Sequence, residues 1–435
     1  MIRKSFGMGF AFCIANTALL PVSQAQAQTK ASVPDESLFG DNTVRLDEED
    51  DLQISARLTI EGSLLEDIDL DSLTDDSQAR IQPEARVDVL YTPDDDIEIL
   101  ASVEAGFDLD RRTGQWDSIE RLEIRELNIL FDDFLAKDFQ LQVGRQDVED
   151  GREWLYDSRL DGIRVAYDHR QWRIEAMWGR EELVRANLLK NQPVRRKVDN
   201  WLFHAEYEAT PDWDISAYAI KQKDLRASNI SPLTIGIQSE GRMGQIGHWL
   251  ELAQQSGTSG TRKLRARAVD AGVIWHLPLP AKPALFAGYA HATGGGDATK
   301  DKGFRQTGLQ DNEDRITGLG NVRYYGEALD PDLSNIEIFT LGMGIRPTAS
   351  SSLELIAHRY RQAVRDDDDI RGSPISAELS GDDRDIGTEI DVAFSTRLAK
   401  PVALEAKVGW FMPGKGFDTF RKDAILAKVR LVFRF

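Results

Sequence analysis

Hydrophobic and polar residues alternate along most of the chain from residue 52 onward. The pattern is clear where Trp172, Ile174 and Trp178 share one face and Arg173 and Glu175 share the other. A period of two predicts β-strands that are apolar on one side only. The segments with this pattern are 52–60, 80–91, 97–107, 119–131, 139–146, 160–167, 171–179, 201–210, 213–222, 245–254, 266–276, 284–292, 335–346, 352–361, 387–396, 401–411 and 424–435.

These segments predict an all-β fold, a transmembrane antiparallel β-barrel over residues 52–435. Residues 321–327, with Val322, Tyr324 and Tyr325, form a weaker additional segment. Single-chain bacterial barrels favour even strand numbers, so we predict about 18 strands, with 16 as the alternative. Closure into a barrel also removes the sheet edges that so many strands would otherwise expose.

The connections and the last strand support a barrel of the outer membrane. Pro and Asp nucleate short turns, as at Pro93, whereas 183–200, 293–320 and 361–386 are long. Short periplasmic turns and long extracellular loops are typical of such barrels. The last strand alternates up to Phe435 and resembles a barrel assembly signal. Aromatic residues at segment ends predict interfacial girdles, among them Tyr91, Trp172, Trp201, Trp249 and Tyr360.

The N-terminus predicts export from the cytoplasm. Residues 1–27 have a basic head, an apolar stretch and a small-x-small end at Ala25 and Ala27, the pattern of a signal peptide. Residues 28–51 are acidic and aperiodic, which indicates a flexible leader. The single cysteine, Cys13, lies in the signal, so the mature chain has no thiol. We therefore expect the outer membrane, after cleavage near Ala27.

Composition limits the kind of partner. The formal net charge is −20, and removal of Arg3 and Lys4 makes it about −22. So acidic a chain is a poor candidate for nucleic-acid binding. Beyond the signal no apolar run is long enough to span a membrane as a helix. Barrel strands need only one apolar face, which reconciles membrane residence with this composition.

The sequence shows no catalytic motif. The histidines are scattered, and no zinc-binding spacing, phosphate-binding loop or nucleophile elbow is present. We therefore predict no enzyme, no cofactor and no metal site. The four consecutive acids 366–369 lack the spacing of a calcium loop, so Ca²⁺ there is expected at most in an acidic extracellular loop.

Charged residues gather between 143 and 167. The motifs are Gly144-Arg145-Gln146, Arg152-Glu-Trp-Leu-x-Asp157 and Leu160-Asp-Gly-Ile-Arg-Val165, with Gly387-Thr-Glu-Ile-Asp391 later. In these motifs the chain resembles the alginate export porin family. The resemblance implies an eighteen-stranded monomeric barrel that exports an acidic exopolysaccharide through a constriction lined by arginine and lysine.

The resemblance assigns Arg145, Arg152 and Arg164 to that constriction. Alternation independently turns Arg164 inward, whereas strict alternation from Val143 would point Arg145 outward, so a bulge must be assumed there. Further cations expected in the pore are Arg359, Arg361, Lys428, Arg430 and Arg434. Acids expected in the lumen are Asp157, Asp161, Glu389 and Asp391.

Two interpretations of the arginines stay open. Guanidinium groups are planar, always charged and bind carboxylates, which suits passage of a polyuronate. Alternatively, they pair with neighbouring acids and brace the lumen. The leading hypothesis is outward conduction of an alginate-like polymer; the alternative is an uptake porin for small anions or sugar acids. Expected partners are the anionic polysaccharide, lipopolysaccharide with outer-membrane lipid, and a periplasmic scaffold lipoprotein.

Overall fold

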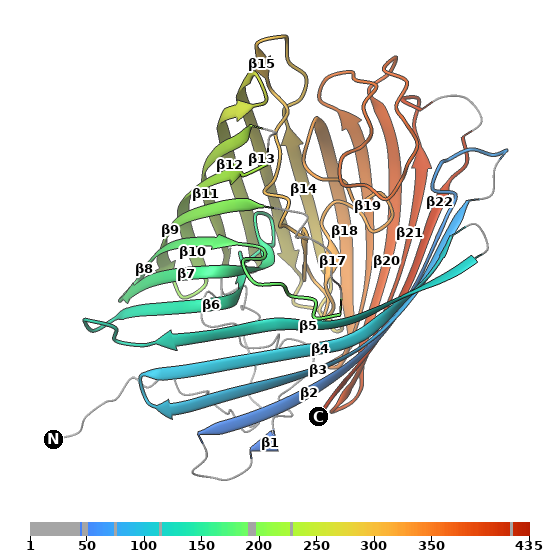
Figure 1. The fold of residues 1–435 in the computed structure, drawn as a ribbon. Coiled ribbons are helices and arrows are strands. Elements are labelled where there is room, and N and C mark those ends of the chain that lie inside the picture. Colours follow the sequence, from blue (N-terminus) through green and yellow to red (C-terminus); the bar gives the residue numbers. More distant parts are fainter. Residues whose placement is uncertain are drawn as a thin grey trace.

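Strands close into a single barrel. The computed structural model describes residues 51–73, 76–112, 115–189, 197–226, 229–417 and 421–435, with the backbone of Val44–Arg45. Within these ranges eighteen antiparallel strands form the barrel, and β22 pairs with β2 to close it (Figure 1). In the same ranges no helix is long and apolar enough to cross a membrane.

The barrel strands are β2 (Leu52–Glu66), β3 (Ser77–Asp94), β4 (Ile97–Arg112), β5 (Gln115–Phe131), β6 (Phe139–Glu149), β7 (Asp157–His169), β8 (Trp172–Arg180), β9 (Val198–Thr210), β10 (Trp213–Asp224), β11 (Ile230–Met243), β12 (Ile246–Ser259), β13 (Arg262–His276), β14 (Ala284–Ala292), β18 (Ile336–Thr348), β19 (Ser351–Gln362), β20 (Asp385–Ala399), β21 (Val402–Pro413) and β22 (Ala424–Arg434). Four two-residue strands complete the set: β1 (Val44–Arg45), β15 (Lys300–Asp301), β16 (Glu313–Asp314) and β17 (Val322–Arg323).

The eighteen-stranded all-β barrel is confirmed, but one strand lies elsewhere than expected. Within 321–327 only Val322–Arg323 form a strand, β17, which pairs with β16 inside a loop. The missing barrel strand is β11. Pro232, which cannot donate a ladder hydrogen bond, and Gly236 interrupt its apolar pattern, although Ile235 and Ile237 still face outward.

The two ends of the barrel differ. At the end that holds Phe435 the connections are short, namely residues 95–96, 132–138, 170–171, 211–212, 244–245, 277–283, 349–350 and 400–401. The long connections, including 181–197, 293–335 and 363–384, all lie at the opposite end. This is the expected asymmetry of turns and loops. The expected signal peptide, 1–27, and most of the leader, 28–51, lie outside the described residues.

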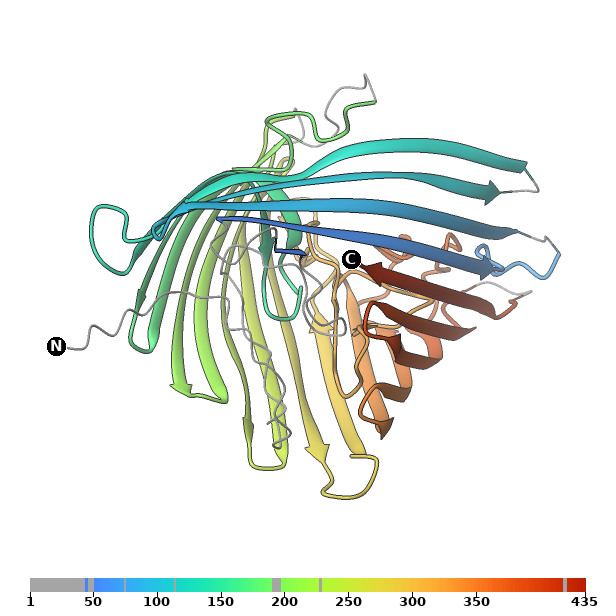
Figure 2. The same ribbon diagram turned by 90° about the horizontal axis from the view of Figure 1, so that it is seen from below.

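Two loops fold into the barrel rather than away from it. Residues 150–156, between β6 and β7, and 293–335, between β14 and β18, lie within the ring of strands in the view along the barrel (Figure 2). Trp154 and Phe304 pack with rings 5.8 Å apart inside a buried cluster that also holds Leu329. The hydrophobic core of the molecule therefore sits in the lumen, while the barrel's outer face carries exposed apolar residues.

Lipid-facing residues should tolerate charge poorly. Leu341, in the middle of β18, is 66% exposed on the outer face. Leu341→Arg is expected to lower the free energy of unfolding in vesicles by about 2–4 kcal/mol, because the charge would face hydrocarbon. Leu135→Arg, in the short turn 132–138, is the control and should have little effect. Urea titration followed by heat-modifiable gel mobility measures both; equal effects would contradict the assigned lipid face.

Candidate functional site

Wall carboxylates hold the long inward loop by its backbone. Glu354 of β19 accepts hydrogen bonds from the N–H groups of Thr317 and Gly318, at 3.1 and 3.0 Å. Glu389 of β20 accepts those of Ala328 and Leu329, at 2.6 and 3.0 Å. The loop 293–335 is thereby fixed against the wall formed by β19 and β20.

A buried lysine holds a second part of the same loop. Lys407 of β21 lies 2.7 Å from Glu313 and 3.1 Å from Glu327. Burial alone would raise the pKa of the Glu313 carboxyl, but the Lys407 ammonium and the Arg323 guanidinium hold it well below its usual value. Glu313 therefore stays ionised. These contacts occupy the wall at β21, so the loop covers the inner faces of three consecutive strands.

Arg152 joins the two inward loops to the opposite wall. Its Nη2 lies 2.9 Å from Asp270 Oδ2 of β13, and its guanidinium lies 4.6 Å from the Trp249 ring and 4.1 Å from the Tyr324 ring. Tyr325 donates its hydroxyl to the same carboxylate at 2.9 Å. An arginine that is stacked on two rings and paired with a carboxylate stabilises the structure, and its guanidinium is not available to bind a polymer. For Arg152 the bracing interpretation describes the geometry.

Trp249 and Tyr360 correct the expectation of aromatic girdles. Both are buried and face the lumen, where Tyr360 donates its hydroxyl to Glu389 at 3.1 Å. Tyr91, Trp172 and Trp201 are exposed on the outer side, as girdle residues should be. A position near a strand end does not tell which face a side chain lies on. Successive residues of a strand point to opposite faces, so the face depends on whether the residue lies an even or an odd number of positions from a residue of known orientation.

The cations of the last strand face inward as expected. Lys428 pairs with Glu61 of β2 at 3.2 Å, and Arg430 lies 3.9 Å from Glu405 of β21. The Arg430 side chain is 38% exposed. Arg434 shares their parity, while Val429 and Phe435 are exposed on the other side. This strand therefore presents a basic inner face that the inward loop does not bury.

Other predicted arginines divide between the two faces. Arg164 is buried and lies on the inner face of β7, between the lipid-exposed Ile163 and Val165. Arg359 and Arg361 share the outer face of β19 with the exposed Leu355, so the structure does not place them in the lumen. The sequence did not fix the parity of β19, because residues 352–361 are apolar or charged on both faces.

Arg145 lies on the outer face, which corrects its expected place in the constriction. The ladder between β6 and β7 has no register shift across 139–149, so the assumed bulge is absent there. Arg145 donates to Asp161 from Nε and Nη2, at 2.7 and 2.9 Å. Asp161 is therefore not a lumen acid either. Residues 181–189, here called the flap, cover this pair.

The remaining lumen acids differ from one another. Glu389 and Asp391 are buried on the inner face of β20, as expected. Asp391 lies 3.2 Å from His358. Asp157 lies at the start of β7, where it offers an oxygen within 4.8 Å of oxygens from Glu153 and Asp311. Burial, reinforced by Asp157 and other nearby carboxylates, raises the pKa of Glu153 to about 11, so Glu153 is protonated at neutral pH.

The acids 366–368 also come together. Their carboxylates lie within 4.8 Å of one another, with Asp367 and Asp368 exposed, in the loop between β19 and β20. Repulsion from Asp366, with burial second, raises the pKa of Asp368. Binding of Ca²⁺ at this loop stays a prediction.

The inner wall at β3 to β5 also carries arginines that the sequence analysis did not single out. On β3 to β5, Arg86 pairs with Asp88 at 2.6 Å and Glu126 at 3.2 Å, and Arg121 pairs with Asp108 at 2.9 Å. Alternation with the exposed Val87 would have turned Arg86 inward. It would have misplaced Arg121, because the ladder between β4 and β5 shifts register at Ser102 and Val103 and changes the face of the residues before it. The passage is lined by paired charges of both signs.

Comparisons with known proteins agree with this architecture. A family model described as Alginate export matches residues 50–430. The alginate production protein AlgE of Pseudomonas aeruginosa is 33% identical over 150 residues, which cover 34% of this chain and 30% of that protein. AlgE of Azotobacter vinelandii is 32% identical over 135 residues, covering 29% and 27%. The chain thus matches less than a third of each curated relative.

Solved structures share the fold at low sequence identity. OccK11 (OpdR) of Pseudomonas aeruginosa has a TM-score of 0.56 at 13% identity, over 90% of this chain and 99% of that one. OccAB3 of Acinetobacter baumannii has a TM-score of 0.56 at 10% identity, over 88% and 99%. At this identity the likeness concerns the barrel fold alone.

Removal of the Arg152 guanidinium should loosen both inward loops. Arg152→Gln leaves the buried Asp270 without its ion partner, which is expected to cost about 3–5 kcal/mol. We expect faster protease cleavage within 293–335, and partial recovery in Arg152→Gln/Asp270→Asn, because that variant leaves no buried charge unpaired. Arg226→Gln, at an exposed arginine that pairs with Asp224, is the control. Unchanged cleavage in Arg152→Gln would show that the contact does not hold the loops.

Protonation of Glu153 should make the inward loops pH-dependent. A carboxyl whose pKa rises on folding stabilises the folded state below its unfolded pKa, and this contribution is lost as the pH rises toward about 11. Protease cleavage within 293–335 should therefore increase between about pH 5 and about pH 9. Glu153→Gln, which mimics the protonated form, should flatten the increase. Cleavage that decreases with pH would contradict the assignment.

Proposed function

The chain belongs to the alginate export family, and we propose that it conducts an acidic, alginate-like exopolysaccharide outward through the outer membrane. Its architecture is that of an outer-membrane transport barrel. The proposed path follows the inner faces of β22 and β2 to β5. It avoids β19 to β21, where the loop 293–335 fills the lumen.

A row of three arginines on neighbouring strands supports this path best. Arg434 of β22 lies opposite Arg57 of β2, and Arg57 lies opposite Arg86 of β3. The alternation along each strand places all three on the inner face of the barrel. Three cationic side chains on neighbouring strands concentrate positive potential at one level of the inner wall, which would attract an anion there. A polyuronate offers one carboxylate per sugar and would supply that anion.

Weak, replaceable pairing suits transport of a long polymer. The 3.9 Å separation of Arg430 and Glu405 is longer than a charge-assisted hydrogen bond. A uronate carboxylate can therefore take the place of the protein's own carboxylate at small net cost. Each site must release the polymer to the next site, and acids interspersed with the arginines prevent tight binding. The protein would act as a conduit, with the driving force supplied by polymer synthesis.

The inward loop favours one alternative, an uptake porin for small anions or sugar acids. By filling the lumen against β19 to β21, it narrows the passage, which suits a small solute as well as a single polymer strand. We further propose that the barrel works as a monomer, in contact with lipopolysaccharide and with a periplasmic scaffold lipoprotein.

Planar-bilayer recordings test the path. We expect anion selectivity and current block by oligouronates, with the blocking affinity reduced about tenfold in Arg57→Gln/Arg434→Gln, a loss of about 1.4 kcal/mol. Arg359→Gln, a neutralised arginine on the outer face, is the matched control. Heat-modifiable mobility confirms folding of each variant. A cation-selective pore that ignores uronates would overturn the proposed export function, and block only by monomeric sugar acids would favour uptake.

A further inference from the structure

Among the residues that the structure describes, half of β5 has no neighbouring barrel strand on one side. β5 pairs with β4 along its length but with β6 only over Leu127–Phe131. We call the edge at residues 115–126 the seam. Unpaired backbone groups are costly in a bilayer. The flap pairs with part of this edge: Leu188 N–H donates to Leu122 O at 2.8 Å, and Ile124 N–H donates to Ala186 O at 3.1 Å.

A charged pair lies behind the flap on the lipid-facing side of the wall. Arg145 is opposite Leu127 of β5 and Asp161 of β7, and the residues two positions away, Val143 and Ile163, are exposed on the outer face. Yet the side chains of Arg145 and Asp161 are only 5% and 9% exposed. An uncovered ion pair at this place would face hydrocarbon, which is unfavourable.

The flap shields the pair with its own backbone. The N–H groups of Leu183 and Val184 donate to Asp161 Oδ2 at 2.7 and 2.8 Å. Arg145 donates to the carbonyl of Val184 and, at 3.0 Å, to the carbonyl of Ile124. Both charged groups are thus bonded to peptide groups on the side that faces away from the lumen. In Figure 2 the connection that contains the flap runs outside the ring of strands, next to β5.

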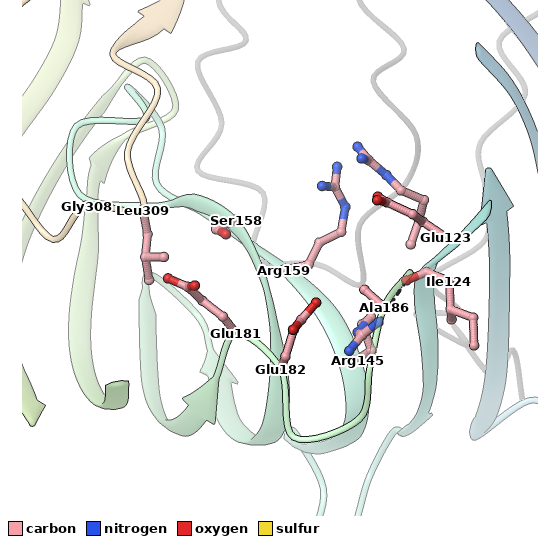
Figure 3. Close-up of a pocket in the computed structure, with 11 residues that line it drawn as sticks. Glu123, Ile124, Arg145, Ser158, Arg159, Glu181, Glu182, Ala186, Gly308 and Leu309 are labelled. Carbon is pink, nitrogen blue, oxygen red and sulfur yellow. Dashed lines mark hydrogen bonds between the residues drawn. The ribbon is translucent and has the colours of Figure 1, made fainter. Parts of the chain in front are cut away.

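The flap carries both acidic and apolar residues. Glu181 and Glu182 line a pocket of about 300 Å³, together with Arg159 of β7 and Gly308 and Leu309 of the lumen loop (Figure 3). Four large apolar residues of the flap do not line this pocket and are exposed, with Val184 at 67% and Leu188 at 53%. They are Leu183, Val184, Leu188 and Leu189.

We propose that the flap is a membrane-embedded seal: it closes the seam in the barrel wall, and its apolar side contacts the acyl chains of the outer leaflet. The edge that the flap covers is continuous with the lipid-facing belt of the barrel. Ile124, which the flap pairs with, is opposite Val103 of β4, and Val103 is opposite Val87 of β3; both valines are exposed on the outer face. The flap extends this belt over the seam. The inference is independent of the cargo.

The Arg145–Asp161 pair is the latch of this seal. It joins β6 to β7 and binds the flap from beneath, so its loss would free the flap while both strands keep their ladder. Release of the flap would connect the pocket behind it, and through Gly308 and Leu309 the lumen loop, with the lipid phase. The wall would then have a lateral opening at the seam.

Thiol accessibility tests the lipid contact in intact outer membranes. Val184→Cys and Leu188→Cys should react with a charged maleimide at least about tenfold more slowly than Val364→Cys, because hydrocarbon excludes the reagent and suppresses the thiolate. Val364 is an exposed valine of the extracellular loop 363–384 and the matched control. An uncharged, lipid-soluble maleimide should narrow the difference, because hydrocarbon does not exclude it, although thiolate formation there stays suppressed. Equal rates with the charged reagent would overturn the proposal, and the unsubstituted chain measures background from Cys13.

Two further variants test the seal and its latch. Glu123→Cys/Asn187→Cys should form a disulfide, because these residues form an antiparallel bridge between β5 and the flap. Asp161→Asn should raise labelling by the charged maleimide several-fold in the Val184→Cys chain. It should also lower the disulfide yield in the Glu123→Cys/Asn187→Cys chain. Asp199→Asn, which breaks the neighbouring Arg180 pair, should change neither. Failure of the disulfide to form would overturn the proposed seal. Equal labelling in Asp161→Asn and Asp199→Asn would overturn the proposed latch.

Discussion

A peptide group in hydrocarbon has no water to bind, so each spanning strand must find two hydrogen-bonding neighbours. This constraint explains why β2 and β22, the first and last barrel strands, meet with Leu58 opposite Phe433. It also explains why one face of every strand is apolar while the chain as a whole is acidic. Where the constraint is not met by a barrel strand, along 115–126 of β5, the flap provides part of the pairing.

Inside the barrel, polar and charged side chains supply the hydrogen-bonding partners that the buried loop needs. Glu354 and Glu389 accept backbone amides of the long loop, and Arg152 is enclosed by two aromatic rings and Asp270. Ionised groups buried in this way must be paired, because an isolated charge would pay a large desolvation cost. The lumen therefore has two regions: a packed interior against β19 to β21, and a wall of paired charges along β22 and β2 to β5.

The sequence predicted the fold well because alternation with a period of two is a local property that closure does not change. It failed at β11, where Pro232 and Gly236 break the apolar pattern but not the ladder. The orientation of the site residues was harder to predict from the sequence. Arg430 and Arg434 could be placed from the apolar face ending in Phe435, whereas Arg359 and Arg361 could not, because β19 alternates weakly. The partners of Arg152 come from distant strands and a loop, and one sequence holds no signal for such contacts.

The position of Trp154 bears on how the molecule forms. Its indole N–H donates to the Tyr325 hydroxyl at 2.8 Å, across a sequence separation of 171 residues, and Arg152 reaches Asp270 across 118. Closing such long loops is slow, and here the two loops come from opposite sides of a ring of strands. The filled lumen can form only once β6, β13 and β18 have been brought into one barrel. The contacts that fill the lumen therefore depend on closure of the whole barrel, and neighbouring strands alone cannot form them.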